Sequence, residues 1–556
     1  SPPVTDVGAV YLYNPEGLLI STLYGSATGD FVGVGDVTVL ANGNFVVRSP
    51  NWNGNRGAVT WGSAVSGFIG GANVTVSAAN SLTGSTVGDL VGSSSITVLT
   101  NGNYVVHSLN WTDGLFFGAG AVTWGNGFTG TVGAISAANS LIGSASGDVV
   151  GNGGVTALSN GNYVVCSPNW DNGPDVNAGA ATWCDGNGGT TGPVTTANSL
   201  HGTTANEFVG GGGVTALTNG NYVVCSVSWD NGPIVNAGAI TWGNGFTGIS
   251  GPVTAANSLV GSTAGDEVGN FGITALSNGN YLVRSPFWDN APVVDVGAVT
   301  WGDGFTGSTG PITAANSLVG STANDQVGNT GVTALTNGNY VVLSPTWDNG
   351  PLVNAGAATW GNGFSGVFGP VSSANSLVGT TPEDRVAGAG VTALTNGNSV
   401  VTAPLWNNGP TANVGAVTWG NGFTGIKGPV TAANSLVGST ANDQVGNISV
   451  TALTNGHYVV CSFLWDSETV TNAGAVTWGN GVTGIRGPVT AANSLTGSQE
   501  DDAVGSHGIT ALVNGHYLVR SGDWANGPVS KAGAVTLGNG FPVTTGHVTA
   551  ANSLVG

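Results

Sequence analysis

Tryptophan, aspartate and asparagine stand next to one another four times in the chain, each time just before a turn that contains proline. An indole ring can stack on a sugar ring, and a neighbouring carboxylate and amide can orient sugar hydroxyls. The triplets therefore have the composition of a carbohydrate site. The alternative is that each tryptophan covers the end of a hydrophobic core while the polar residues form the turn. The candidate ligand-binding residues are Trp170, Asp171 and Asn172; Trp229, Asp230 and Asn231; Trp288, Asp289 and Asn290; and Trp347, Asp348 and Asn349.

A single acidic residue recurs with the same spacing. A carboxylate beside a glycine-rich turn can accept backbone N–H bonds and fix the turn, and we expect this structural role here. A catalytic pair would need two carboxylates in one cleft, whereas this pattern places one acid in each repeat. The residues are Asp30, Asp89, Asp148, Glu207, Asp266, Asp325, Asp384, Asp443 and Asp502.

A second tryptophan recurs inside an apolar segment, and Leu537 replaces it in the last copy, which favours core packing. Its copies are Trp61, Trp124, Trp183, Trp242, Trp301, Trp360, Trp419 and Trp478. No set of reactive residues stands apart from these patterns. The six histidines are scattered without metal-ligand spacing. Strings such as Gly243-Asn244-Gly245 lack the strand-to-helix context of a phosphate loop. We therefore expect no catalytic residues, no metal, no cofactor and no enzymatic activity.

The repeat itself is defined by the tripeptide Asn-Ser-Leu, whose copies follow one another every 59 residues from Asn80 to Asn552. Residues 26–556 are then nine tandem repeats without net insertion, which we expect to form one domain. Residues 1–25 resemble the second half of one repeat.

Four short strands are predicted in each repeat, illustrated by residues 203–261. They are Val214–Leu217, Tyr222–Cys225, Gly238–Trp242 and Val253–Leu259. The first two flank an Asn-Gly turn, the strongest short hairpin signal. Short strands that are apolar on both faces are typical of sheets sandwiched between neighbours. The pattern predicts an all-β protein, a β-propeller of about nine four-stranded blades. The alternative is an open β-solenoid or superhelical array of the same units.

The unit resembles the FG-GAP repeat of integrin α-type β-propellers. Gly29-Asp30-Phe31-Val32-Gly33 stands before the first strand, and the segment from Gly8 to Tyr13 is close to that family's third strand. The resemblance implies propeller blades. In that family calcium binds an Asp-rich loop between the first two strands, but here the loop is only Leu217 to Tyr222 and lacks room for six or seven oxygen ligands. The repeats are also similar to arrays in large bacterial exoproteins of the filamentous-haemagglutinin and adhesin type, which implies an exported, surface-associated protein.

The composition of the chain limits the classes of partner that it can bind. The net charge is −20 with 8 Lys and Arg residues, so no basic patch exists for nucleic acid. No run of about 20 apolar residues is present, so we expect no membrane span. Ser1 at the start and the absence of Met are typical of a processed export product or an excised segment. Cys166, Cys184, Cys225 and Cys461 are expected to be buried small hydrophobic residues without disulfides.

These observations predict a secreted, cell-surface structural or adhesive protein of a bacterium, acting as a non-catalytic scaffold. The alternative is a lectin-like, multivalent carbohydrate-binding propeller. The expected partners are other copies of the chain, in head-to-tail or fibre assembly, or surface glycans. An open array would leave two unpaired ends, which favours the first of these.

Overall fold

The computed structural model describes residues 5–541 and 543–556. Throughout this range the chain is built from short β-strands, as the sequence predicts. The one helical segment among these residues is α1 (Trp52–Asn55), a single turn in which Asn53 and Gly54 have left-handed backbone angles. The chain divides into two compact units, residues 1–275 with 303–311, and residues 276–302 with 312–556. Each unit is described by itself.

Repeat 4 (residues 203–261) shows how one sheet forms. Strand A is β19 (Val214–Ala216), which turns at Asn219-Gly220 and pairs antiparallel with strand B, β20 (Tyr222–Ser226). Strand B pairs antiparallel with strand C, β21 (Ala239–Gly243), and strand C pairs with strand D, β23 (Ser258–Val260). Gly220 has a positive φ of 89°, the conformation that the tight hairpin requires.

A fifth strand comes from the next repeat. Between strands C and D, every repeat has a two- or three-residue strand E that leaves its own sheet and pairs in parallel with strand D of the preceding repeat. Thus β22 (Gly251–Pro252) of repeat 4 pairs with β18 (Leu200–His201) of repeat 3. Backbone hydrogen bonds therefore join each sheet to the following repeat.

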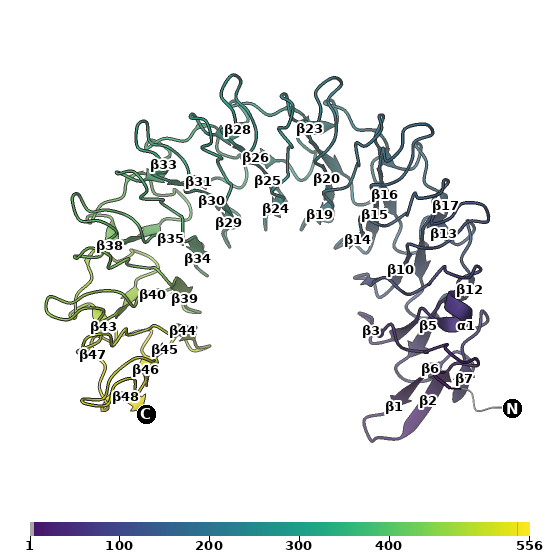
Figure 1. Cartoon of the computed structure of the whole chain (residues 1–556), viewed down its shortest axis with the longest axis horizontal. Helices are drawn as coiled ribbons and strands as arrows, with labels where there is room; N and C mark the ends of the chain where they lie inside the picture. Colours follow the sequence, from purple (N-terminus) through teal and green to yellow (C-terminus); the bar gives the residue numbers. More distant parts are fainter. Residues whose placement is uncertain (1–4, 542) are drawn as a thin grey trace. The chain divides into compact units, whose positions relative to one another are not determined.

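The remaining strands follow the same scheme (Figure 1). Strands A are β3 (Val37–Val39), β9 (Ile96–Val98), β14 (Val155–Ala157), β24 (Ile273–Ala275), β29 (Gly331–Ala334), β34 (Val391–Ala393), β39 (Ser449–Ala452) and β44 (Ile509–Ala511). Strands B are β4 (Phe45–Ser49), β10 (Tyr104–Ser108), β15 (Tyr163–Ser167), β25 (Tyr281–Ser285), β30 (Tyr340–Ser344), β35 (Ser399–Ala403), β40 (Tyr458–Ser462) and β45 (Tyr517–Ser521). Strands C are β1 (Ala9–Tyr13), β5 (Ala58–Ser63), β11 (Ala121–Gly125), β16 (Ala180–Cys184), β26 (Ala298–Gly302), β31 (Ala357–Gly361), β36 (Ala416–Gly420), β41 (Ala475–Gly479) and β46 (Ala534–Gly538).

Strands D are β2 (Leu19–Tyr24), β8 (Ser81–Thr83), β13 (Ser140–Ile142), β28 (Ser317–Val319), β33 (Ser376–Val378), β38 (Ser435–Val437), β43 (Ser494–Thr496) and β48 (Ser553–Val555). Strands E are β7 (Asn73–Thr75), β12 (Gly133–Ala134), β17 (Gly192–Pro193), β27 (Gly310–Pro311), β32 (Gly369–Pro370), β37 (Gly428–Pro429), β42 (Gly487–Pro488) and β47 (Gly546–His547). The additional β6 (Gly67–Phe68) pairs with β5. The N-terminal half-unit is the pair β1–β2, extended by β7 of repeat 1.

The division into units follows from strand E. Residues 303–311 belong to the first unit although the rest of repeat 5 from Leu276 onward belongs to the second. The reason is that β27 completes the sheet of repeat 4 by pairing with β23.

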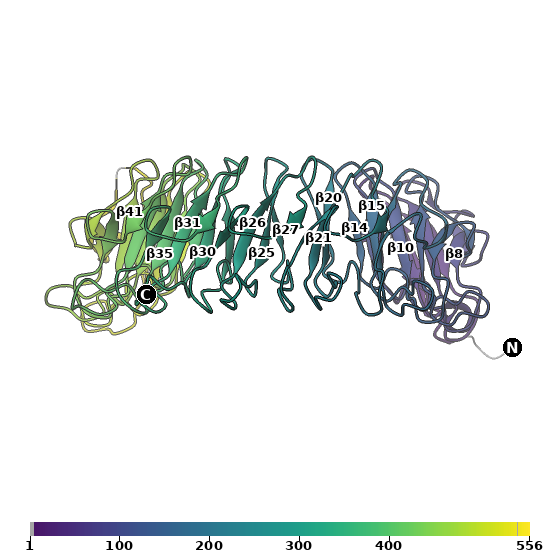
Figure 2. The ribbon, with the colours of Figure 1, turned by 90° about the horizontal axis from the view of Figure 1, so that it is seen from above.

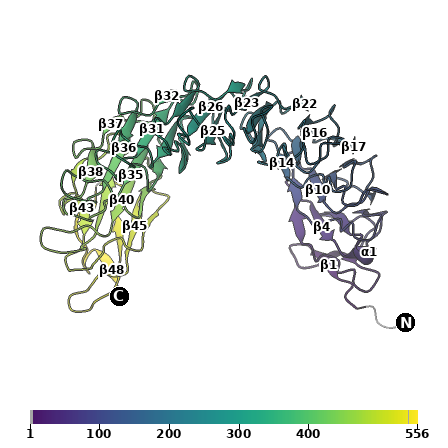
Figure 3. The same ribbon diagram turned by 45° about the horizontal axis from the view of Figure 1, so that its top comes forward.

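The hydrophobic core lies between sheets. Within each unit successive sheets lie one behind another, with strands A of neighbouring repeats in contact (Figures 2 and 3). Val164 and Cys166 of repeat 3 pack against Tyr222 and Val224 of repeat 4, and all four are buried. Strand B is buried on both faces, which confirms the expectation that the strands are sandwiched between neighbours.

The expectation of a single closed propeller is wrong. The described residues contain no closed barrel or propeller, and each repeat has its own small sheet. A propeller blade keeps its strands within one radial sheet. Here strand E instead pairs with the sheet of the preceding repeat, so that backbone hydrogen bonds link neighbouring repeats.

The expected fourth strand, Val253–Leu259, is also wrong in its bounds. Pro252 ends strand E, and Asn257 then builds a turn. The side chain of Asn257 accepts the N–H of Thr254 at 2.9 Å and donates to the carbonyl of Pro252 at 2.9 Å. Strand D therefore begins only at Ser258. Its hydroxyl lies 2.7 Å from that of Thr241 in strand C, which explains why Asn-Ser-Leu recurs so regularly.

Candidate functional site

The tryptophan rings of the four Trp-Asp-Asn triplets are buried. Trp170, Trp229, Trp288 and Trp347 lie in the loop between strands B and C and are only 2–4% exposed. Their indole N–H groups have no hydrogen-bond partner among the described residues. Stacking on a sugar needs an exposed ring face, which these rings do not offer. Their burial agrees with the core-covering alternative.

The polar members of the triplets are used inside the loop. Each aspartate accepts one backbone N–H six residues further on, for example that of Asn177 by Asp171 at 2.8 Å and that of Asn236 by Asp230 at 2.8 Å. Asp289 and Asp348 do the same, at 2.7 and 2.8 Å. The amide groups of Asn172, Asn231 and Asn349 donate to the glycine carbonyl that closes the repeat, at 3.0, 3.2 and 3.1 Å. Asn290 shows no such bond, but its backbone forms the same loop bridge to Val293.

The recurrent acid before strand A has the expected structural role. In repeat 6 the carboxylate of Asp325 is fully buried and accepts the N–H groups of Ser321, Thr322 and Asp348 at 2.7, 2.8 and 2.9 Å. One carboxylate thus ties the turn before strand A to the residue that follows the loop tryptophan. Burial raises the pKa of the Asp325 carboxyl above its ordinary value, although the three N–H donors act in the opposite direction. Asp148 has the same contacts and the same direction of pKa shift.

A second set of polar contacts joins neighbouring repeats. The carbonyl oxygen of Gly245 in repeat 4 accepts three donors from repeat 3, at 2.7 Å from Asn160, 2.9 Å from Asn162 and 3.0 Å from Trp183. The two asparagines flank the hairpin glycine, and Trp183 is the tryptophan of strand C. We call such a group of three donors on one glycine carbonyl a clamp. A Cβ atom at Gly245 would overlap the carbonyl oxygen of Gly220, so only glycine fits there.

Clamps recur along the chain and are linked to one another. Asn221 accepts the N–H of Gly245 in its own repeat at 3.0 Å and donates to the carbonyl of Gly304 in the next at 2.9 Å. The amide thereby continues a hydrogen-bonded line from repeat to repeat. The accepting glycines are Gly127, Gly186, Gly245, Gly304, Gly363, Gly422 and Gly481.

The clamp changes in the last repeats. His457 and His516 replace the second asparagine, and their Nδ1 atoms accept the N–H of Gly481 and Gly540 at 3.0 and 3.1 Å. Each imidazole therefore keeps the accepting half of the contact. The indole N–H of Trp478 has no hydrogen-bond partner within the described ranges.

The cysteines lie among the buried residues of the hydrophobic core. All four cysteines are free and buried, which confirms the prediction from sequence. Burial raises the pKa of each thiol to about 12. Residues 5–541 and 543–556 contain no group of three or more His, Cys, Asp or Glu side chains placed to hold a metal ion. No helix in the part of the chain that the structure describes is long and apolar enough to cross a membrane.

Comparison with known families matches the repeats one by one. A family model described as a repeat of unknown function (DUF5650) matches residues 39–93, 98–152, 157–211, 216–270, 275–329, 334–388, 393–447, 452–506 and 511–556. The chain belongs to the DUF5650 repeat family. Successive DUF5650 matches begin 59 residues apart, from 39 to 98 to 157 and onward, which confirms the period and the nine tandem repeats. The FG-GAP resemblance is not confirmed. Comparison with curated proteins finds no match.

Sequence reasoning assigned the Asn-Gly-Asn segment of the DUF5650 repeat to a hairpin turn and missed the clamp. A usable signal was present. A two-residue turn needs only Asn-Gly, yet a second asparagine follows the glycine in repeats 1 to 7. The strand C tryptophan was assigned to core packing, and it does pack beside the core, as Trp183 shows. Its indole N–H, however, also links two repeats.

Proposed function

We propose that this DUF5650 chain is a non-catalytic structural scaffold of an exported bacterial protein associated with the cell surface, serving adhesion or self-assembly. The observation that carries the proposal is the use of the recurrent polar and aromatic residues. The carboxylates fix turns, the asparagines and strand C tryptophans join neighbouring repeats, and the loop tryptophans fill the core. Residues that recur in most repeats thus serve the cohesion of the array. This use fits a mechanical or display role better than turnover of a substrate.

Exposed phenylalanines support the adhesive part of the proposal. Phe246 and Phe305 of the first unit are 63% and 58% exposed, and Phe364 and Phe423 of the second are 66% and 64% exposed. They occupy the same turn after strand C in successive repeats. Weak contacts that are repeated along one chain add up through multivalency. A scaffold that presents the same apolar residue many times suits attachment to an extended partner.

Surface labelling of the cells that encode the chain tests the proposal. Antibodies raised against the purified chain are expected to label intact cells, and protease added from outside is expected to remove the label. A cytosolic protein followed in the same cells serves as the control and should stay protected. Labelling only after cell lysis would contradict the proposed location and the adhesive role with it.

A further inference from the structure

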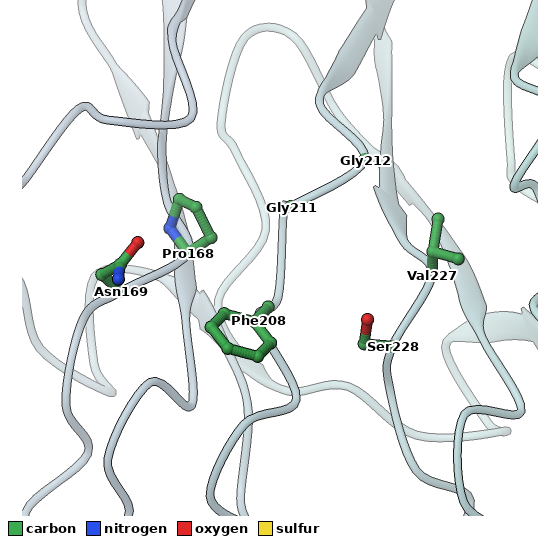
Figure 4. A pocket seen from close by; sticks show the side chains of 7 residues that line it. All are labelled: Pro168, Asn169, Phe208, Gly211, Gly212, Val227 and Ser228. Carbon is green, nitrogen blue, oxygen red and sulfur yellow. The ribbon is translucent and has the colours of Figure 1, made fainter.

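Repeat 4 departs from its neighbours at a surface pocket of about 350 Å³ (Figure 4). The ring of Phe208 lies between Pro168 and Asn169, which follow strand B of repeat 3, and Val227 and Ser228, which follow strand B of repeat 4. The glycines Gly211 and Gly212 complete the lining. All of these residues belong to the first unit.

The pocket is open because one side chain is missing. Gly211 takes a position that asparagine holds in several other repeats. In repeat 3 the equivalent Asn152 donates to the side chain of Asn169, and in repeat 6 Asn329 donates to the hydroxyl of Thr346 at 3.0 Å. A similar bond joins Ser506 to Asp523 in repeat 9, at 3.1 Å.

Repeat 4 lacks this bridge. Gly211 has no side chain to reach Ser228, and the hydroxyl of Ser228 makes no hydrogen bond within the described residues. The neighbouring Gly212 also lines the pocket without a side chain. The result is a hollow with an unused hydroxyl at its wall.

Phe208 gives this pocket its aromatic ring. The counterparts in repeats 1 to 3 are also apolar (Phe31, Leu90 and Val149), whereas those in repeats 6, 8 and 7 are polar (Gln326, Gln444 and Arg385). The backbone φ at these positions is positive and nearly constant, 47° at Phe208 against 45°, 44° and 43° at the three polar counterparts. The fold therefore sets the direction of the side chain, and the exchange of a polar group for a ring changes the chemistry of the pocket without changing its frame.

The lining selects a class of ligand. It has no charged side chain, and a chain of net charge −20 repels anions. It offers an aromatic ring together with proline and valine. Its hydrogen-bonding groups are the hydroxyl of Ser228 and the amide of Asn169, whose oxygen already accepts from Asn152 but can accept a second hydrogen bond. A volume of about 350 Å³ lies at the small end of ligand pockets. A pyranose combines an apolar C–H face with hydroxyls around its edge and fits this lining.

We propose that the pocket binds the ring of a neutral sugar, stacked on Phe208, with its hydroxyls bonded to Ser228 and Asn169. The site differs from the buried Trp-Asp-Asn loops and occurs in repeat 4 rather than in every repeat. The sugar site is independent of the proposed scaffold role, so a negative result for one proposal does not contradict the other.

Saturation-transfer NMR on the whole chain tests the proposal, with neutral methyl glycosides of glucose, galactose, mannose and N-acetylglucosamine as probes. Methyl glucuronide is the charged comparison. We expect at least one neutral glycoside to bind with a dissociation constant on the order of millimolar, as for a single shallow subsite. We expect the glucuronide to bind at least tenfold more weakly.

Two variants copied from neighbouring repeats locate the binding. Phe208→Gln removes the ring, and Gly211→Asn refills the pocket, and each introduces the residue that other repeats already carry at that position. Both are expected to lower the affinity at least tenfold with an unchanged melting temperature. Gly388→Asn, the same exchange in repeat 7, is the matched control and should bind as the parent does. The proposal is overturned if no neutral glycoside binds the parent chain, or if both variants bind it as well as the parent.

Discussion

His107 should make the stability of the first unit depend on pH. It lies in β10, is 5% exposed, and its Nε2 atom is 3.0 Å from the hydroxyl of Thr97. Burial lowers the pKa of His107 from 6.5 to about 4. The equivalent position holds an arginine in repeats 1, 5 and 9, and an uncharged residue in the others, such as Leu343 in repeat 6. Replacement of His107 by leucine therefore uses a side chain that the fold already accommodates.

The sign of the effect follows from the lowered pKa. The unfolded chain takes up a proton near pH 6.5, whereas the folded chain resists protonation until about pH 4. The contribution of the neutral, buried His107 side chain to stability is therefore complete above pH 6.5. It falls as the pH is lowered and is lost by about pH 4. A difference of about 2.5 pKa units corresponds to roughly 3 kcal/mol. The parent chain should lose about this much more stability than His107→Leu over that range.

Urea titration with brief amide-deuterium pulses measures this difference. Mass spectrometry of peptides covering β10 reports the fraction unfolded at each urea concentration, at pH 7.5, 6.0 and 4.5. Carboxylates also titrate near pH 4, and the comparison of the two chains cancels their contribution. Equal pH dependence in the parent and in His107→Leu would refute the reasoning, because the buried imidazole would then not be the source.

Three further outcomes follow from the contacts. Trp242→Phe removes the N–H that donates to Gly304 and should lower stability by about 1 kcal/mol in the same titration, whereas Trp478→Phe, whose N–H has no partner, should cost less. Equal losses of stability in the two tryptophan variants would contradict a role for the indole hydrogen bond. Asp325→Ala leaves three backbone N–H groups without their acceptor and should cost roughly 3 kcal/mol or more, with Asp325→Asn in between; a loss below about 1 kcal/mol in the alanine variant would contradict the structural role. Cys166 should resist alkylation at pH 8 in the folded chain and react after unfolding in urea, and rapid labelling of the native chain would contradict its burial.

The sequence predicted the local structure of a repeat well, for reasons that are local. Asn219-Gly220 predicts a tight turn, in which Gly220 has the positive φ, and the apolar runs on either side are long enough only for short strands. Strands A and B were therefore placed within one residue of their bounds. Asp325 was assigned to a turn because a carboxylate beside glycines accepts nearby N–H groups, and it does so. These inferences need no knowledge of which sheet lies next to which.

The sequence could not predict how repeats connect. A two-residue strand such as β22 has too few residues to show a pattern, and its partner β18 lies about 50 residues earlier in the chain. The same holds for Asn160 and Gly245, which are 85 residues apart. A closed ring of blades and a chain of linked sheets share the same sequence period. The choice between them depends on pairings between repeats that hydrophobic periodicity does not encode.

The candidate site illustrates the same limit. Trp229 beside Asp230 and Asn231 has the composition of a sugar site, yet the ring is 4% exposed and the polar groups are used within the loop. Residue type alone does not distinguish a ring that faces solvent from one that closes a core. The pocket beside Phe208 came from comparing repeats with one another, because it depends on what repeat 4 lacks.

Disulfide trapping of strand E tests the central claim, that each repeat supplies a strand to the sheet before it. Thr496 in β43 of repeat 8 lies opposite His547 in β47 of repeat 9, and their side chains are 3.1 Å apart. The double variant Thr496→Cys with His547→Cys is predicted to form an intramolecular disulfide on mild oxidation, detected by peptide mass spectrometry. The pair His547→Cys with Val555→Cys, which joins β47 to strand D of its own repeat, is predicted not to form one. A disulfide in the second pair and none in the first would contradict the claim, because the strands of repeat 9 would then form a self-contained blade.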